Sequence, residues 1–165
     1  WGWAQNAPFR RYKQWAHEGG IATPCIAWWP GQIKANSITK GVGHIIDFMP
    51  TFLELAGGKY PAKHKGNDIL PVEGKSLLPI LNGGKREGHE QIAWQWSDNR
   101  ALREGKWKLV WDKLDKRWSL FDLEADRTET NDLASANPKR VVRLKKDWFT
   151  WAKKCGFNID KLPGR

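Results

Sequence analysis

Residues 91–123 read QIAWQWSDNRALREGKWKLVWDKLDKRWSLFDL, and this stretch carries a strong secondary-structure signal. Short runs rich in aromatic and branched residues alternate with polar pairs that favour turns, such as Asp98-Asn99 and Glu104-Gly105. We expect four strands, at Gln91 to Trp96, Arg100 to Arg103, Lys106 to Trp111 and Arg117 to Leu123. The short separations predict an antiparallel meander.

The third of these runs predicts how the sheet is oriented. Trp107, Leu109 and Trp111 fall on one face of a strand, and Lys106 and Lys108 fall on the other, because successive side chains of a strand point to opposite faces. This alternation is typical of an antiparallel sheet with one buried and one solvent-exposed side. We therefore expect both lysines to face water.

A long amphipathic helix is predicted after the meander. Asn137 is a good N-cap, Pro138 fits the first helical position, and Gly156 supplies a stop. Apolar side chains recur at helical spacing, and they are Val141, Leu144, Trp148, Trp151, Ala152 and Cys155. We expect this helix to cover the apolar face of the sheet and to carry its basic residues mostly on the outer side.

The first part of the chain has a different pattern. Thr23 to Trp29 is nearly continuous in apolar residues and predicts a strand buried on both faces of a mainly parallel sheet. Asp47 to Ala56 predicts a helix that ends at Gly57-Gly58. We expect an α/β fold: the trailing strand and helix of a larger α/β domain in residues 1–58, a connecting segment in 59–90, and a small four-stranded antiparallel sheet packed against a C-terminal helix in 91–165.

The composition indicates an anionic partner but does not identify which kind. The 165 residues carry a formal charge of +10, which favours anionic partners such as nucleic acid, acidic lipid, or sulfated and phosphorylated substrates. Twelve tryptophans supply surfaces on which sugars or bases could stack, although packing explains most of them equally well. The two cysteines are too few for a disulfide framework, and Cys25 is expected to be buried. The opening Trp-Gly-Trp-Ala has no leader features, so we expect an internal start.

One lysine is a candidate for chemistry. Lys13 lies near Arg10 and Arg11, and together these cations could hold a sulfate or phosphate oxygen and stabilise negative charge that develops in a transition state. Three cations in such a short stretch are, however, more often a solvated surface. The residues alone leave both interpretations open.

Several segments in collinear order resemble the C-terminal part of a sulfatase. Lys13 stands five residues before the Glu18-Gly19-Gly20 turn, as the sulfate-gripping lysine does in that family. Three further segments are similar to sulfatase motifs: Pro24-Cys-Ile-Ala-Trp-Trp-Pro-Gly31, the 44–57 segment with Asp47-Phe-Met-Pro-Thr51, and Leu120-Phe-Asp-Leu-Glu-Ala-Asp126 with the residues that follow it. The resemblance covers nearly the whole chain.

The resemblance implies an alkaline-phosphatase-like fold and a sulfuric ester hydrolase, active on a sulfated carbohydrate or an aryl sulfate. It implies a formylglycine nucleophile, made within a Cys/Ser-x-Pro/Ala-x-Arg motif, and a calcium ion held by Asp and Asn side chains. It assigns Lys13 to catalysis and sulfate binding, and it makes Arg100 a candidate substrate contact. His17, beside Glu18, is a further candidate contact, with local packing and hydrogen bonding of its imidazole as the alternative that we favour slightly. It also implies a periplasmic or secreted enzyme.

The sequence departs from the family in two respects. Neither Cys25 nor Cys155 nor any serine is followed by the required arginine, and no candidate Asp-Asn pair for the metal precedes Lys13. We therefore expect the nucleophile and calcium ligands to be encoded upstream, no metal ligands in these residues, and no turnover by residues 1–165 alone.

Other functions are kept as alternatives. A phosphonate or phosphodiester hydrolase of the same superfamily could use the same lysine and metal. A basic, Trp-rich module could bind single-stranded nucleic acid or glycans by stacking and charge. Against nucleic acid, the tryptophans fall at periodic positions typical of a core, so our expected partner is a sulfate ester, with neither nucleic acid nor membrane.

Overall fold

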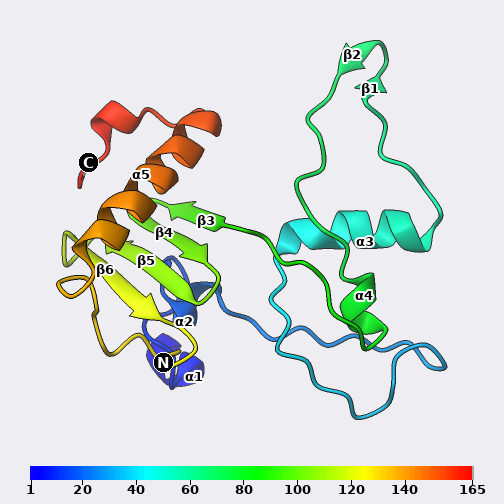
Figure 1. Ribbon diagram of the computed structural model, residues 1–165, viewed down its shortest axis with the longest axis horizontal. Helices are drawn as coiled ribbons and strands as arrows, with labels where there is room; N and C mark the ends of the chain where they lie inside the picture. Colours follow the sequence, from blue (N-terminus) through cyan, green and yellow to red (C-terminus); the bar gives the residue numbers. More distant parts are fainter. Residues whose placement is uncertain (165) are drawn as a thin grey trace. The chain divides into compact units, whose positions relative to one another are not determined.

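The computed structural model describes residues 1–164, which form two compact units (Figure 1). The first unit contains Trp1–Pro24 and the chain from Glu90 onward, and the second contains Cys25–His89. The second segment of unit 1 therefore begins at Glu90. The first 24 residues, which the sequence grouped with 25–58, lie instead in the same unit as the sheet.

Unit 1 is built on a four-stranded antiparallel sheet. Its strands are β3 (Ile92–Trp96), β4 (Asn99–Glu104), β5 (Trp107–Asp112) and β6 (Arg117–Asp122), in the order β3-β4-β5-β6 (Figure 1). Each strand pairs with the next through a short turn, as the polar pairs between the runs predicted. The predicted meander is confirmed, with strand limits that differ by one residue at several ends.

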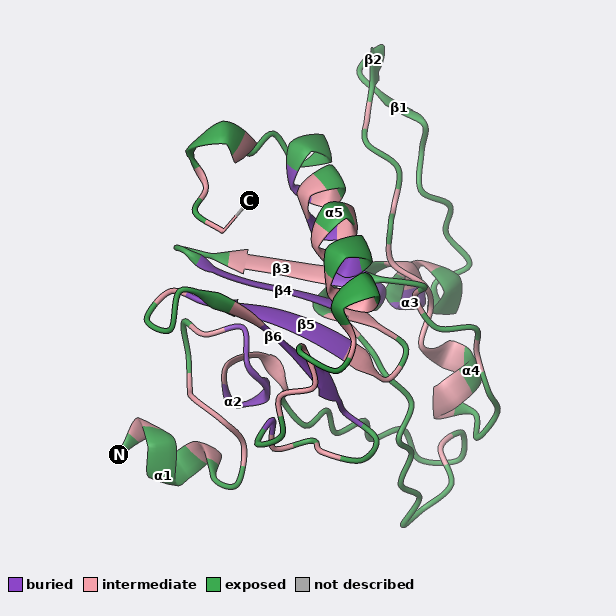
Figure 2. Cartoon of the chain, turned by 60° about the vertical axis from the view of Figure 1, so that its left-hand side comes forward, coloured by how far each residue is buried: buried purple, intermediate pink, exposed green. Residues whose placement is uncertain are grey.

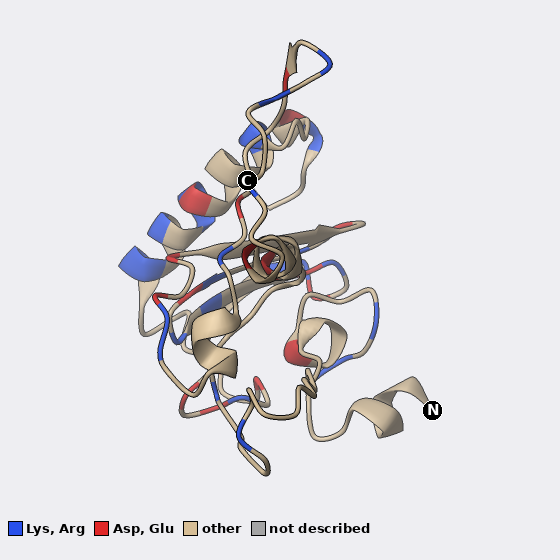
Figure 3. Ribbon diagram, turned by 90° about the vertical axis from the view of Figure 1, so that its right-hand side faces the viewer, with Lys and Arg blue, Asp and Glu red and all other residues tan. Residues whose placement is uncertain are grey.

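One face of the sheet is covered by α5 (Pro138–Lys154). The apolar core on this face joins three strand leucines to three residues of the helix, and these are Leu102, Leu109, Leu120, Leu144, Trp148 and Ala152. A short 3₁₀ helix, η2 (Ile159–Lys161), follows. The predicted helix and its place on the sheet are therefore confirmed. Figure 3 shows Lys and Arg along the part of α5 that does not face the strands.

The opposite face is also buried, which the sequence did not predict. The N-terminal segment that includes the short helix α2 (Glu18–Ile21) lies against it, and Ala16 packs onto Ala101, Val110 and Phe121 (Figure 2). The first short helix, α1 (Gly2–Asn6), has no buried residue. Lys108 is 0% exposed on this face. The expectation that Lys108 faces water was wrong, because alternation of charged and apolar residues cannot distinguish solvent from a buried set of ion pairs.

Unit 2 contains short elements within long connections. They are η1 (Ile45–Asp47), α3 (Phe48–Leu55), β1 (Lys63–His64), β2 (Asn67–Asp68) and α4 (Leu78–Leu81), and β1 and β2 form a two-stranded hairpin. The helix predicted between Asp47 and Ala56 is confirmed as α3. Several of its apolar side chains are exposed within the described chain, Phe52 by 64%.

Asp47 organises unit 2 through its carboxylate. It accepts hydrogen bonds from the backbone nitrogens of His44 and Lys75, both at 2.8 Å, from Arg86 at 2.8 Å, and it pairs with Nε2 of His89 at 2.7 Å. Burial opposes ionisation, but the hydrogen bonds from Arg86, Lys75, His44 and His89 outweigh it and lower the pKa of Asp47 to about 2. The Asp47 side chain thus joins His44, Lys75, Arg86 and His89, and it makes no capping hydrogen bond to α3.

No strand forms at Thr23 to Trp29 within the described residues. Ile26 and Trp28 are exposed, Trp28 by 86%, and Cys25 is an exposed free thiol. These predictions were wrong for the described chain. A strand of the predicted kind needs hydrogen-bonding neighbours at its edges, and residues 1–164 offer it none.

Candidate functional site

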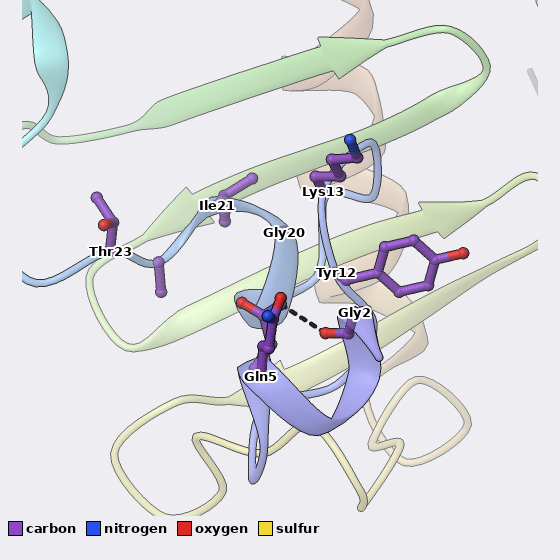
Figure 4. Close-up of a pocket in the computed structure, with 10 residues that line it drawn as sticks. Gly2, Gln5, Tyr12, Lys13, Gly20, Ile21 and Thr23 are labelled. Atoms are coloured by element: carbon purple, nitrogen blue, oxygen red, sulfur yellow. Dashed lines mark hydrogen bonds between the residues drawn. The ribbon is translucent and has the colours of Figure 1, made fainter.

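A cavity of about 590 Å³ lies in unit 1 beside Lys13 (Figure 4). Three segments of the N-terminal region line it, and their residues are Gly2, Gln5, Asn6, Tyr12, Lys13, Gly19, Gly20, Ile21, Ala22 and Thr23. Figure 4 shows Gln5 on α1 and Lys13 on the loop before α2 at opposite ends of this cavity. The lining offers one cation, two side-chain amides and the backbone of a glycine turn.

Lys13 lies on an unusual loop. The residues Arg11 and Gln14 on either side have positive φ angles of 66° and 79°, in the left-handed region that side chains disfavour. The Trp15 nitrogen donates to the Tyr12 carbonyl at 3.2 Å and closes a tight turn around Lys13. Lys13 is exposed, and no residue of the described chain forms an ion pair with it. Its ammonium is therefore available to an external anion.

The glycines of the Glu18-Gly19-Gly20 turn are required by close backbone contact. A Cβ on Gly19 would overlap the carbonyl oxygens of Arg10 and Arg11, and one on Gly20 would overlap those of Tyr12 and Trp15. The Gly19 nitrogen also donates to the Arg10 carbonyl at 2.9 Å. The backbone of this turn therefore packs directly against the loop that carries Lys13.

Glu18 anchors this turn to the sheet through a buried ion set. The Lys108 ammonium lies 2.8 Å from Glu18 Oε1 and 2.9 Å from Glu129 Oε1. The Glu18 backbone nitrogen donates to the second oxygen of Glu129 at 2.7 Å. Burial raises the pKa of Glu129, while the Lys108 ammonium opposes that shift. Two carboxylates surround one ammonium in a site closed to water. Removal of any one of the three groups would therefore leave a buried charge without its partner, which is energetically costly.

Two further contacts hold the lysine loop to the sheet. The Arg11 guanidinium donates to Asp112 Oδ2 from Nε at 3.0 Å and from a terminal nitrogen at 2.7 Å. The Asn99 side-chain amide donates to the Gln14 carbonyl at 2.7 Å and accepts from the Lys113 backbone nitrogen at 3.1 Å. Asn99 and Asp112 are both buried at the same end of the sheet.

His17 lies close to this site but does not line the cavity. Its side chain is 1% exposed and packs 6.3 Å from Phe121 between ring centroids. Burial, together with Lys108 and Arg10, lowers the pKa of His17 to about 3. A neutral buried imidazole cannot supply charge to a bound sulfate near neutral pH, so we no longer propose His17 as a substrate contact.

Arg100 lies on the opposite face of the sheet, under α5. Its guanidinium carbon is 5.5 Å from the ring centroid of Trp111 and 5.2 Å from that of Trp148, and it donates to the Pro163 carbonyl. Its side chain is 0% exposed, and burial lowers its pKa. The structure does not bring Arg100, which was expected as a candidate substrate contact, to the Lys13 cavity.

The described residues do not fit a calcium site. Within residues 1–164 there is no group of three or more His, Cys, Asp or Glu side chains placed to hold a metal ion. The buried carboxylates already bind cations of the protein, Asp47 through Arg86 and Asp112 through Arg11. Across the same residues, no helix has the length and apolar character to cross a bilayer.

Sequence reasoning found Lys13 and missed the residues that hold its loop. Lys108 was expected to face water and Asn99 to lie in a turn, and neither Asp112 nor Glu129 was singled out. One signal was present, since Lys108 and Asp112 share a strand face with the apolar Val110. A buried apolar residue between two charges indicates that the charges can be buried and paired as well.

Comparison with known proteins places these features in a family. Residues 9–148 match the family model described as N-sulphoglucosamine sulphohydrolase, C-terminal. An uncharacterized sulfatase of Schizosaccharomyces pombe is 30% identical over 162 residues, which cover 94% of this chain and 29% of the relative. The N-acetylgalactosamine-6-sulfatase of Canis lupus familiaris is 32% identical over 116 residues, which cover 70% of this chain and 21% of the relative.

A solved structure shares the fold. Ps i-CgsB in complex with k-i-k-neocarrahexaose superposes with a TM-score of 0.73 at 22% identity, over 89% of this chain and 32% of that chain. The chain thus spans less than a third of the length of each of these three proteins. The match over residues 9–148 includes the Lys13 loop, the glycine turn and the whole sheet. The resemblance read from the sequence is confirmed, and the chain belongs to the sulfatase family, in the C-terminal region described for N-sulphoglucosamine sulphohydrolase.

Proposed function

We propose that this chain is the C-terminal portion of an enzyme that hydrolyses sulfate esters, and that Lys13 contacts the sulfate group. The observation that carries the proposal is the unpaired Lys13 ammonium at a cavity, on a loop inside the family match. The neighbouring Arg10 and Arg11 are engaged with Glu129, Asp112 and Asp115, so they stabilise the loop and leave Lys13 to bind the anion.

The proposed chemical role of Lys13 follows from its charge. A fixed ammonium attracts a sulfate oxygen in the ground state and stabilises the negative charge that grows on the leaving oxygen as the S–O bond breaks. The Gln5 amide can donate a hydrogen bond to a polar group of the ester. The Asn6 amide nitrogen and the Gly19 and Gly20 nitrogens already donate to carbonyls of the protein, so they shape the cavity wall. Lys13 and Gln5 bind and orient the substrate.

The nucleophile and the metal belong to the rest of the proposed enzyme. A formylglycine hydrate would attack sulfur, and calcium would polarise the sulfate oxygens. Residues 1–164 lack a fitting calcium site, so we assign neither group to them. We accordingly expect residues 1–165 alone to be inactive.

Lys13→Ala in the intact enzyme tests the proposal. We expect kcat/KM for sulfate esters to fall by about 100-fold or more, in the range seen when one donor to developing charge is removed. Lys139→Ala is the matched control, because Lys139 is an exposed lysine on α5 outside the cavity. Near-normal turnover by Lys13→Ala would overturn the assignment.

The substrate proposed is a sulfated carbohydrate or an aryl sulfate. Sulfate esters are favoured over phosphonates and phosphodiesters because the family match is to a sulphohydrolase and the similar curated proteins are named as sulfatases. Paired sulfate and phosphate esters of one alcohol, assayed with the intact enzyme, separate the two reactions. Preferred hydrolysis of the phosphate ester would refute this choice.

The proposed location is periplasmic or secreted, and the proposed partner is the substrate itself. Fractionation of cells that express the intact enzyme tests the location, since activity confined to the cytosol would contradict it.

A further inference from the structure

We infer that Asn99 is a positioning residue for Lys13; the inference rests on the proposed function and extends it to a residue that does not line the cavity. Asn99 is fully buried at the start of β4, and both ends of its amide are used. Its nitrogen holds the carbonyl of Gln14, the residue next to Lys13, and its oxygen holds the nitrogen of Lys113 after β5. One side chain therefore fastens the lysine loop to the end of the sheet.

The loop needs such a contact because its conformation is intrinsically unfavourable. Two residues with positive φ, Arg11 and Gln14, bracket Tyr12 and Lys13. Strained conformations of this kind persist only where surrounding contacts hold them. The Arg11 guanidinium fixes one end of the loop through Asp112, and Asn99 fixes the other through the Gln14 carbonyl. Lys13 lies between these two anchors.

The direction of the Lys13 side chain is not set by an ion pair within the described residues. No residue within 1–164 forms an ion pair with its ammonium, so the backbone at positions 12–14 determines where the side chain starts. Releasing the Gln14 carbonyl lets that backbone relax toward negative φ and turns Lys13 away from the cavity. Asn99 thus acts on the anion through the loop, without touching the anion.

The test compares Asn99→Ala with Asn137→Ala in the 165-residue chain. Asn137 makes a similar contact, from its side-chain amide to the Leu133 carbonyl at 3.0 Å, before α5 and outside the cavity. Amide hydrogen exchange at Tyr12 to Trp15 reports the loop, and inorganic sulfate titrated against the Lys13 backbone amide signal in NMR reports anion binding. The melting temperature monitors general destabilisation.

We expect Asn99→Ala to speed exchange at the Trp15 amide by about tenfold and to weaken the sulfate response at Lys13 by a similar factor. Asn137→Ala should leave both unchanged. Asn99→Asp, which keeps the shape but cannot donate when ionised, should match Asn99→Ala near neutral pH. Unchanged loop exchange in Asn99→Ala, or equal loosening in both alanine variants, would overturn the inference.

The two proposals fail in different ways. If wild-type Lys13 shows no response to sulfate, the sulfate contact loses its support, while loop exchange still decides whether Asn99 holds the loop. If wild-type Lys13 responds and Asn99→Ala responds equally well, the sulfate contact stands and the positioning role is refuted.

Discussion

The two faces of the β3-β4-β5-β6 sheet are both buried, but by different chemistry. Under α5 the contacts are mainly apolar, between strand leucines and Leu144, Trp148 and Ala152. Under residues 1–24 a small apolar cluster adjoins buried charges, including Lys108, Glu18 and Glu129. Burial of apolar surface is non-directional, whereas buried ions demand particular partners. Contacts on the helix face therefore stabilise the fold, and contacts on the opposite face fix the position of the loop that carries Lys13.

The largest effect should come from the helix face. Trp148→Ala removes a fully buried indole that contacts the rings of Trp118 and Trp151 at a tilt and the ring of Phe149 edge-on. We expect the free energy of unfolding to fall by about 3–5 kcal/mol, independently of pH between 5 and 8. Urea denaturation followed by far-ultraviolet circular dichroism measures it.

Trp96→Ala is the control for that variant, because Trp96 lies on the same sheet and is largely exposed. A loss for Trp148→Ala no greater than that for Trp96→Ala would show that α5 does not dominate the stability of unit 1.

Lys108→Met tests the opposite face. It leaves Glu18 and Glu129 buried without their shared ammonium, and we expect a loss of about 3 kcal/mol in unfolding free energy. Adding Glu129→Gln should recover part of that loss, since it removes one unpaired charge. The measurement is again urea denaturation, repeated at several pH values.

Lys106→Met is the matched control, because Lys106, the residue before β5, pairs with Asp122 of β6 but is partly exposed. Its expected cost is below about 1 kcal/mol. Equal losses for the two lysines would mean that the buried ion set is no more important than a surface pair.

His17 should make the stability of this face depend on pH. Its folded-state pKa of about 3 lies below the ordinary value of 6.5, so the unfolded chain binds a proton first as the pH falls. Above pH 6.5 the contribution of His17 to the free energy of unfolding is fully present. This contribution declines as the pH falls toward 3. At pH 5 the expected loss is about 2 kcal/mol.

His17→Gln should remove that part of the pH dependence, whereas substitution of the exposed His64 should leave it intact. Denaturation curves at pH 7 and pH 5 provide the measurement. An unchanged difference between the two pH values in His17→Gln would contradict the assignment to His17.

The helix face was predictable from sequence, and the charged face was not. Apolar side chains that recur at the period of a strand or a helix indicate one buried face. They do so at Trp107, Leu109 and Trp111 in the sheet, and at Leu144 and Trp148 in the helix. Lys108 carries no such signal, since a lysine faces water unless carboxylates from elsewhere meet it. Its partners come from Glu18 and Glu129, which are 90 and 21 positions away in the sequence.

The candidate site was predictable only in part. The spacing of Lys13 and the Glu18-Gly19-Gly20 turn identified the loop through family resemblance. The predicted contacts His17 and Arg100 failed as cavity residues because sequence proximity and motif membership do not reveal which face of a sheet a side chain occupies. The expected strand at Thr23 to Trp29 also failed, because edge pairing depends on partners outside the segment itself.

The contact between the Glu18 nitrogen and Glu129 spans 111 positions of the chain. During synthesis the amino-terminal loop leaves the ribosome long before Glu129 is translated. The loop that carries Lys13 can therefore reach its final conformation only late in biosynthesis, after Glu129 has left the ribosome. A product truncated before Glu129 would contain Lys13 but would lack the contact that holds its loop in place.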